Sequence, residues 1–185
     1  MKTRQFSYPV ECLNRTVVEN NITITAKTQG QILGVAGGNY RIIISGDATG
    51  GAYAVIEMLV PPGGGPPPHE HPHMQEMFYL VEGELEFKTP AGKTIVQEGG
   101  FVNIPLNGSV HCFRNISDKY ARVLCTVVPA GLDEVFRQVG IPAQPGEFPP
   151  PPPMTTERRA LLASLEEKFG QKTYPPDYLD HLAAQ

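Results

Sequence analysis

The sequence lacks the features that define several common classes of protein. It has only three cysteines, Cys12, Cys112 and Cys125, none close to another and with no CxxC pair. This excludes a disulfide framework and a zinc ribbon. No apolar run approaches the roughly 20 residues that span a bilayer, and the N-terminal MKTRQFSYPVECLNR has no apolar stretch that could form a secretory core. We therefore expect no membrane association and a cytoplasmic location.

The charge pattern argues against binding to nucleic acids. The net charge is −4, and the lysines and arginines are scattered rather than gathered into a basic stripe. Because such a stripe is the usual footprint of phosphate binding, we expect no nucleic-acid partner. A chain of 185 residues can bury one sizeable core, which favours a single domain with extensions.

Short strand signals dominate the first two thirds of the chain. Apolar and β-branched runs alternate with turn residues such as Glu82-Gly83 and Gly99-Gly100, and no helical segment lies between them. The expected strands lie in 21–28, 39–45, 52–60, 77–88, 93–105, 111–116 and 121–128. Many short strands at close spacing predict an all-β barrel or sandwich.

The character of the sequence changes after Pro129. Apolar residues at helical spacing in GLDEVFRQVG predict a helix that ends at Gly140, and the proline run of 144–153 predicts a stiff linker. A second helix is expected in 155–170, capped by Thr155 or Thr156 and ended by Gly170, and its apolar stripe must pack on the barrel exterior or on a second subunit. The tail 174–185 predicts one or two more helical turns. The chain thus divides into an N-terminal strand arm (1–38), a barrel (39–130) and a helical extension (131–185).

Three of the five histidines lie in the stretch PPHEHPHMQEM, residues 67–77. On an extended strand, side chains two residues apart share a face, so His69, His71 and His73 could converge on one cation. A solvated loop is the alternative for any one of them. Glu76, five residues after His71, would face away from it on a regular strand, so its participation requires a bulge or bend, most simply at Pro72. Two ligand sets remain open, one with Glu76 and one with His73 in its place.

The spacing around these residues resembles the two motifs of the cupin superfamily. Gly63, five residues, His69-x-His71, four residues, Glu76, six residues and Gly83 match the first motif position for position. The second motif is matched by Gly99, Pro105, His111 and Asn115, with one extra residue before His111. Either Gly108 or Asn107 then stands where the family has a glycine, since both tolerate a positive φ.

The resemblance implies a fold, a metal site and a chemistry. The fold is a double-stranded β-helix, the jelly-roll cupin barrel, followed here by a C-terminal helical extension. His69, His71, Glu76 and His111 are the implied ligands of one divalent transition metal, and such ligands suit Fe, Mn, Ni, Co or Zn. The segment VVPAGLDEVFRQVGIP further resembles the quercetinase-like subgroup, and cupins of this kind are commonly homodimers.

Two classes of function follow from the resemblance. The first is a metal-dependent dioxygenase that uses dioxygen on a small aromatic or enolisable substrate, with Glu76 as the catalytic base. The second is a non-redox isomerase or lyase, or a cupin that only binds a small molecule. The fold hosts all of these.

Overall fold

The structure is a computed structural model, and it describes residues 22–182. The first 21 residues, which include Cys12 and most of the expected N-terminal arm, lie outside the described part, as do the last three.

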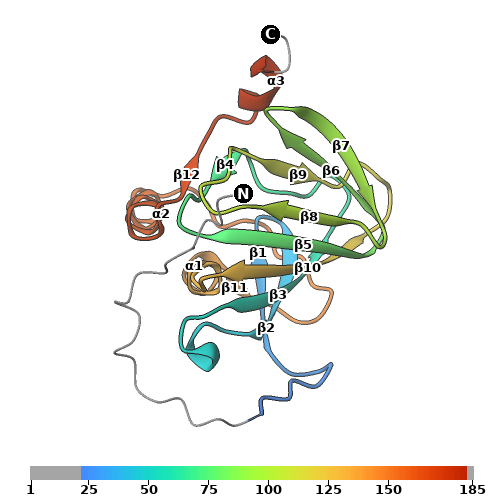
Figure 1. Ribbon diagram of the computed structural model, residues 1–185. Coiled ribbons are helices and arrows are strands. Elements are labelled where there is room, and N and C mark those ends of the chain that lie inside the picture. Colours follow the sequence, from blue (N-terminus) through green and yellow to red (C-terminus); the bar gives the residue numbers. More distant parts are fainter. Residues whose placement is uncertain (1–21, 183–185) are drawn as a thin grey trace, which may run out of the picture.

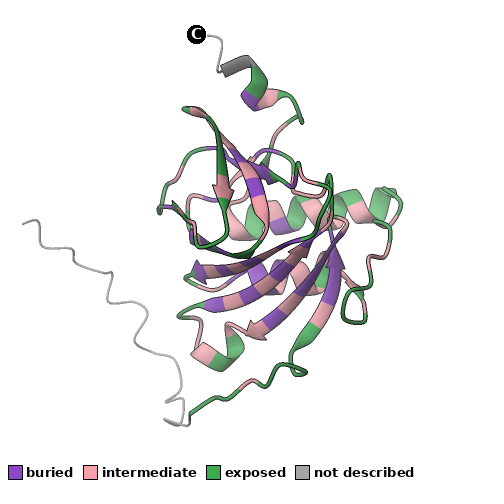
Figure 2. Ribbon diagram, turned by 90° about the vertical axis from the view of Figure 1, so that its right-hand side faces the viewer, coloured by how far each residue is buried: buried purple, intermediate pink, exposed green. Residues whose placement is uncertain are grey.

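Seven strands form the larger sheet, in the order β11-β1-β2-β3-β10-β5-β8. All neighbours in it are antiparallel. The strands are β1 (Gln31–Val35), β2 (Gly38–Ile44), β3 (Ala54–Val60), β5 (Gln75–Glu82), β8 (Phe101–Ile104), β10 (Ala121–Val128) and β11 (Ile141–Pro142). Residues alternate between buried and partly exposed along β3 and β10, which is the period of two expected for strands with one face on a core (Figure 2).

Two smaller sheets complete the barrel (Figure 1). One has the order β7-β6-β9, from Gly92–Gln97, Glu84–Thr89 and Cys112–Arg114. The other pairs the two-residue strands β4 (His69–Glu70) and β12 (Lys172–Thr173). The core lies between the larger sheet and the β7-β6-β9 sheet. Phe78, Phe87 and Phe113 meet there, with ring centroids 5.5 to 5.6 Å apart. This is the predicted jelly-roll barrel.

The helices of the extension begin and end close to the predicted positions. Helix α1 (Leu132–Val139) is followed by Gly140, and α2 (Thr156–Phe169) has Thr155 as its N-cap and Gly170 in the left-handed conformation after its end. Both helices lie on the same side of the barrel (Figure 1). Leu165 of α2 is buried in the main core cluster, with Leu161 and Phe169 packed against it. The apolar stripe of α2 therefore packs on this chain's own barrel. A short helix, α3 (Tyr178–Leu182), follows near the β7-β6-β9 sheet (Figure 1).

One predicted strand is wrong. Residues 22–28 are outside every strand, and Ile22 and Ile24 are 90% and 83% exposed. Their alternating β-branched pattern suits a strand, but within residues 22–182 no strand forms a backbone ladder with them, and a strand needs such a partner. The strand that begins the sheet is instead β1, a little further along the chain.

Candidate metal centre

A bend in the chain brings His71 and Glu76 together. Strand β4 ends at Glu70, residues 72 and 73 form a turn, and β5 begins at Gln75. The turn is closed by the Met74 amide, which donates to the His71 carbonyl at 3.2 Å. Proline at 72 suits it, because proline has no amide to lose from a ladder. The bend expected at Pro72 is therefore present, and it restores Glu76 to the inner face of the barrel.

His111 comes from a distant segment and is fixed against His69 by the backbone. Each of the two residues donates its amide to the other's carbonyl, both at 2.9 Å. This isolated antiparallel bridge joins β4 to the residue just before β9. The two imidazole rings lie with centroids 4.5 Å apart. Backbone pairing thus sets the positions of two of the four side chains.

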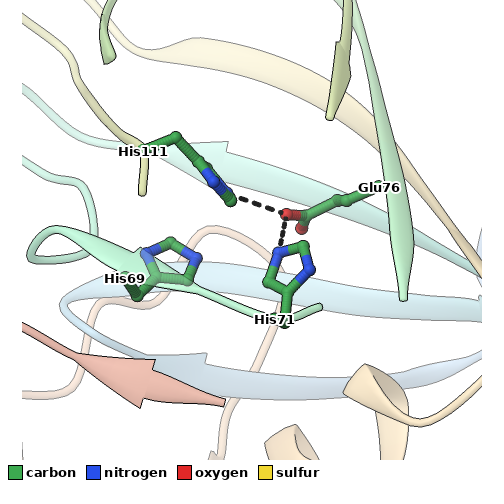
Figure 3. A group of neighbouring side chains, drawn as sticks. All are labelled: His69, His71, Glu76 and His111. Atoms are coloured by element: carbon green, nitrogen blue, oxygen red, sulfur yellow. Dashed lines mark hydrogen bonds and ion pairs between the residues drawn. The ribbon is translucent and has the colours of Figure 1, made fainter. Parts of the chain in front are cut away.

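The four side chains point into one small space (Figure 3). Each of His69, His71, Glu76 and His111 offers one donor atom, and these four atoms lie within 4.8 Å of one another. Oε2 of Glu76 is 2.8 Å from Nε2 of His71 and 3.4 Å from Nε2 of His111. Three of the residues are almost fully buried, and His69 is partly exposed. The group can therefore hold a metal ion.

Backbone carbonyls orient the three rings. Nδ1 of His69, His71 and His111 lies 2.9, 3.1 and 3.0 Å from the carbonyls of Pro67, Met74 and Ser109 respectively. A carbonyl only accepts, so each Nδ1 carries a proton, and in a neutral ring Nε2 keeps a lone pair for a metal ion. Nε2 of His71 lies 2.8 Å from Oε2 of Glu76, an acceptor, so this ring donates from both nitrogens and would give up the Nε2 proton on binding an ion. Metal-bound histidines are commonly held in this way by their second nitrogen.

The electrostatics of the four residues favour a bound cation. Burial, and then His111, lowers the pKa of His69 to about 4, so that this ring is neutral. Burial opposes the charge of Glu76, but contacts with His111 and His71 outweigh it and hold the pKa of the carboxyl well below its usual range. Burial also lowers the pKa of His71, yet its bond to Glu76 makes the net shift upward.

The donor set fits a divalent transition metal. Nε2 of His111 is buried and has no hydrogen-bond partner among residues 22–182, and a buried nitrogen without a partner costs about 1–3 kcal/mol. By contrast, Oε2 of Glu76 accepts from Nε2 of His71, whose Nδ1 donates to the Met74 carbonyl, and a bound ion would replace the Nε2 proton of this ring. A cation bound by these atoms would neutralise the carboxylate and use the lone pair of His111. Three imidazoles and one carboxylate suit first-row ions.

His73 does not join the group. It shares strand parity with His69 and His71 in the sequence, but it lies in the turn, and its ring packs against Gly170 after helix α2 so closely that a Cβ at 170 would collide with it. The ligand set with His73 in place of Glu76 is therefore not the one that the structure assembles. That the four assembled residues bind metal stays a prediction.

The second motif has its left-handed residue at Asn107. Asn107 has φ 58°, whereas Gly108 has no positive φ. The Asn107 amide donates to the Pro72 carbonyl at 2.9 Å, which ties this turn to the bend before Glu76. Asn115, at the end of the motif, is fully buried, and its amide donates to the carbonyls of Val60 and Lys119. The side chain of Asn115 thus ties two segments of the chain together.

One contact of the site was not foreseen from the sequence. The thiol of Cys125 in β10 donates to Oε1 of Glu76, with Sγ 3.2 Å from that oxygen. Burial, followed by Glu76, raises the pKa of Cys125 well above its usual value, so the thiol keeps its proton. The bond leaves Oε2 as the oxygen that faces the histidines. Period-two parity places Cys125 on the inner face, but its register against β5 cannot be read from the sequence.

Comparison with known proteins agrees with this geometry. The family described as "Cupin domain" matches residues 56–127. The matched residues run from β3 to β10, and the barrel that they belong to has the cupin fold. A probable germin-like protein, subfamily 2 member 5, of Arabidopsis thaliana is 32% identical over 109 residues, which is 56% of this chain and 49% of that protein. The chain thus spans about half the length of this curated relative.

Solved structures share the cupin fold at low sequence identity. KdgF from a Halomonas species superposes with a TM-score of 0.54 at 15% identity, covering 62% of this chain and 99% of that one. The polyketide cyclase RemF from Streptomyces resistomycificus gives 0.52 at 19%, covering 75% and 90%. A predicted oxalate decarboxylase from Thermotoga maritima gives 0.52 at 18%, covering 58% and 99%. These likenesses show the fold alone. Among residues 22–182, no helix is both long enough and apolar enough to cross a bilayer.

Proposed function

We propose that this cupin is a metal-dependent enzyme that acts on a small molecule at a single ion held by His69, His71, Glu76 and His111. The observation that carries the proposal is the common orientation of the three imidazoles: each has Nδ1 on a backbone carbonyl, and one ligand atom of each ring lies within 4.8 Å of the others and of the Glu76 carboxylate. A site that only filled the core would not need three imidazoles held by backbone carbonyls around a buried carboxylate.

The chemistry divides between the ion and the chain. A bound divalent ion would act as a Lewis acid, with positions left for a substrate oxygen and for dioxygen. The chain contributes a buried setting for the ion, because His71, Glu76 and His111 are each at most 3% exposed. The partly exposed side of the site is that of His69, and this is where a substrate would enter. Glu76 contributes an anionic oxygen, Oε2, that can accept a proton from a substrate hydroxyl or from an acidic carbon.

The finer proposal is a dioxygenase of the quercetinase-like kind, with a small aromatic or enolisable substrate. It is supported by the resemblance of the segment after the barrel, and by a carboxylate, Glu76, that lies among the three imidazoles where it could accept a proton from a substrate. A base of this kind contributes on the order of 10² to 10⁴ in rate. The non-redox isomerase or lyase needs the same ligands and the same base, and differs only in not consuming dioxygen.

The experiment separates these possibilities in two steps. The protein is purified without a chelating tag, loaded with Fe, Mn, Ni, Co or Zn in turn, and screened on an oxygen electrode with flavonols, diketones and phenols. We expect oxygen uptake with at least one pair of metal and substrate. Uptake with none of them, together with substrate turnover under anaerobic conditions, would contradict the dioxygenase and favour the non-redox reaction.

Glu76→Gln tests the base. The amide keeps one coordinating oxygen and the size of the side chain but loses the proton acceptor, so metal should be mostly retained while turnover falls by about 10² or more. Glu82→Gln is the matched control, because Glu82 lies on the same strand with an exposed carboxylate. If Glu76→Gln turns over at the rate of the control, Glu76 is not the base.

A further inference from the structure

The segment after helix α2 forms part of the wall of the metal centre. Residues 171–180, here called the C-terminal strap, include β12, which pairs antiparallel with β4 so that Thr173 lies opposite His69 and Lys172 opposite Glu70. The Tyr174 amide extends this pairing by donating to the Pro68 carbonyl at 2.8 Å. Strand β4 has only two residues and is therefore held between two partners, His111 on one edge and the strap on the other. Figure 3 shows β12 beside the strand that carries His69.

Side chains reinforce the pairing of the strap with β4. The Tyr174 hydroxyl donates to Oε1 of Glu70 at 2.6 Å. The ammonium of Lys172 lies 4.7 Å from the centre of the Tyr174 ring. The centroids of the Tyr174 and Tyr178 rings are 4.3 Å apart. Because Glu70 and His69 are adjacent on a strand, these contacts hold the outer side of β4 while His69 points inward.

The far end of the strap packs against the segment that carries His111. Leu179 is buried in a small cluster with Val110 and Cys112, the two residues that flank His111. Asp180 then accepts a hydrogen bond from Lys88 at 2.9 Å and lies 3.7 Å from Lys93. Such exposed ion pairs contribute little on their own, so the apolar contact of Leu179 is the main anchor.

We propose that the C-terminal strap is a positioning element of the metal centre. It fixes β4 and the segment around His111, and these two segments carry the histidines that the barrel strands do not hold by themselves. His71 and Glu76 are held instead by the bend at Pro72 and by β5. The inference rests on the proposed metal site. The expected loss of metal affinity follows from the known effect of residues that orient metal ligands without touching the ion. Their removal typically weakens metal binding by about 10 to 100-fold.

The test uses Co²⁺ as the probe, because its affinity and its visible absorption both report on the ligands. Three proteins are compared with the full chain: one that ends at Gly170, the full chain with Leu179→Ser, and the full chain with Leu165→Ala. Leu179→Ser releases the anchor without shortening the chain, so it serves if the truncated protein does not fold. Leu165→Ala is the control, since Leu165 stabilises α2 from within the main core cluster and is not a member of the small cluster that holds Leu179.

The strap predicts a specific pattern of results. Co²⁺ affinity, measured by competition with a chelator, should fall by about 10 to 100-fold on truncation and in the same direction for Leu179→Ser. The absorption spectrum should change in both. Leu165→Ala should lower thermal stability but leave affinity and spectrum as in the full chain. Unchanged affinity and spectrum in both strap variants would overturn the inference while leaving the metal site intact, and failure of the full chain to bind Co²⁺ would instead overturn the proposed function.

Discussion

Leu165→Ala gives the sharpest test of how the helical extension is held. Leu165 is 5% exposed, and it is the one residue of α2 that is fully buried in the main core cluster. Removing its side chain loses the transfer free energy of a buried leucine and leaves a cavity, which together destabilise proteins by about 2–5 kcal/mol. For a chain of this size each kcal/mol shifts the midpoint of thermal unfolding by about 2–4 °C. A loss of about 3 kcal/mol should therefore lower the midpoint by about 6–12 °C.

The assay is thermal unfolding followed by circular dichroism, with denaturant unfolding to give the free energy. Glu167→Gln is the control, because Glu167 lies on the exposed side of the same helix and exposed substitutions are usually within about 0.5 kcal/mol of neutral. If Leu165→Ala and Glu167→Gln unfold at the same temperature, α2 does not pack on the barrel of its own chain, and the reasoning about the strap that follows it loses its foundation.

Three further predictions test individual contacts. Cys125→Ser keeps a donor for Oε1 of Glu76 and should be about 1–2 kcal/mol more stable to denaturant than Cys125→Ala, since hydrogen bonds to charged groups contribute about 1.5–3 kcal/mol; equal stability would mean that the thiol only fills space. Asn115→Ala removes the donor to the buried carbonyl of Val60 and to Lys119 and should cost about 2–4 kcal/mol in the same assay, whereas a loss below about 0.5 kcal/mol would refute the role of Asn115. The homodimer stays a prediction: Phe101 and Tyr79 form an exposed cross-strand pair, so Phe101→Glu should convert dimers to monomers in light scattering, and a wild-type mass of one chain would contradict the dimer.

Most of the barrel could be predicted because the information for it is local. Period-two alternation located β3 and β10, and capping residues located α2 between Thr155 and Gly170. The same local reasoning failed at residues 22–28. An alternating pattern shows that a segment could be a strand, but a strand forms only where another segment supplies its hydrogen bonds.

The candidate site was predictable in its members but not in its surroundings. Parity correctly joined His69 and His71, and it wrongly allowed His73, because a turn at Pro72 breaks the alternation between them. The resemblance to cupins selected Glu76 and His111, which parity could not. The contacts of Cys125 with Glu76 and of β12 with β4 join residues far apart in the chain. Their registers are set by the packed fold, so no short stretch of sequence contains them.

Metal content is the most direct measurement of the central claim. Elemental analysis of the tag-free protein, incubated with one divalent transition metal and then desalted, should give close to one ion per chain. His111→Ala should lose most of the bound metal, because Nε2 of His111 is a buried nitrogen with no hydrogen-bond partner among the described residues. His73→Ala, a histidine from the same stretch that packs on Gly170 instead, should retain the full amount. Full occupancy in His111→Ala, or no ion in the wild-type protein, would contradict the account.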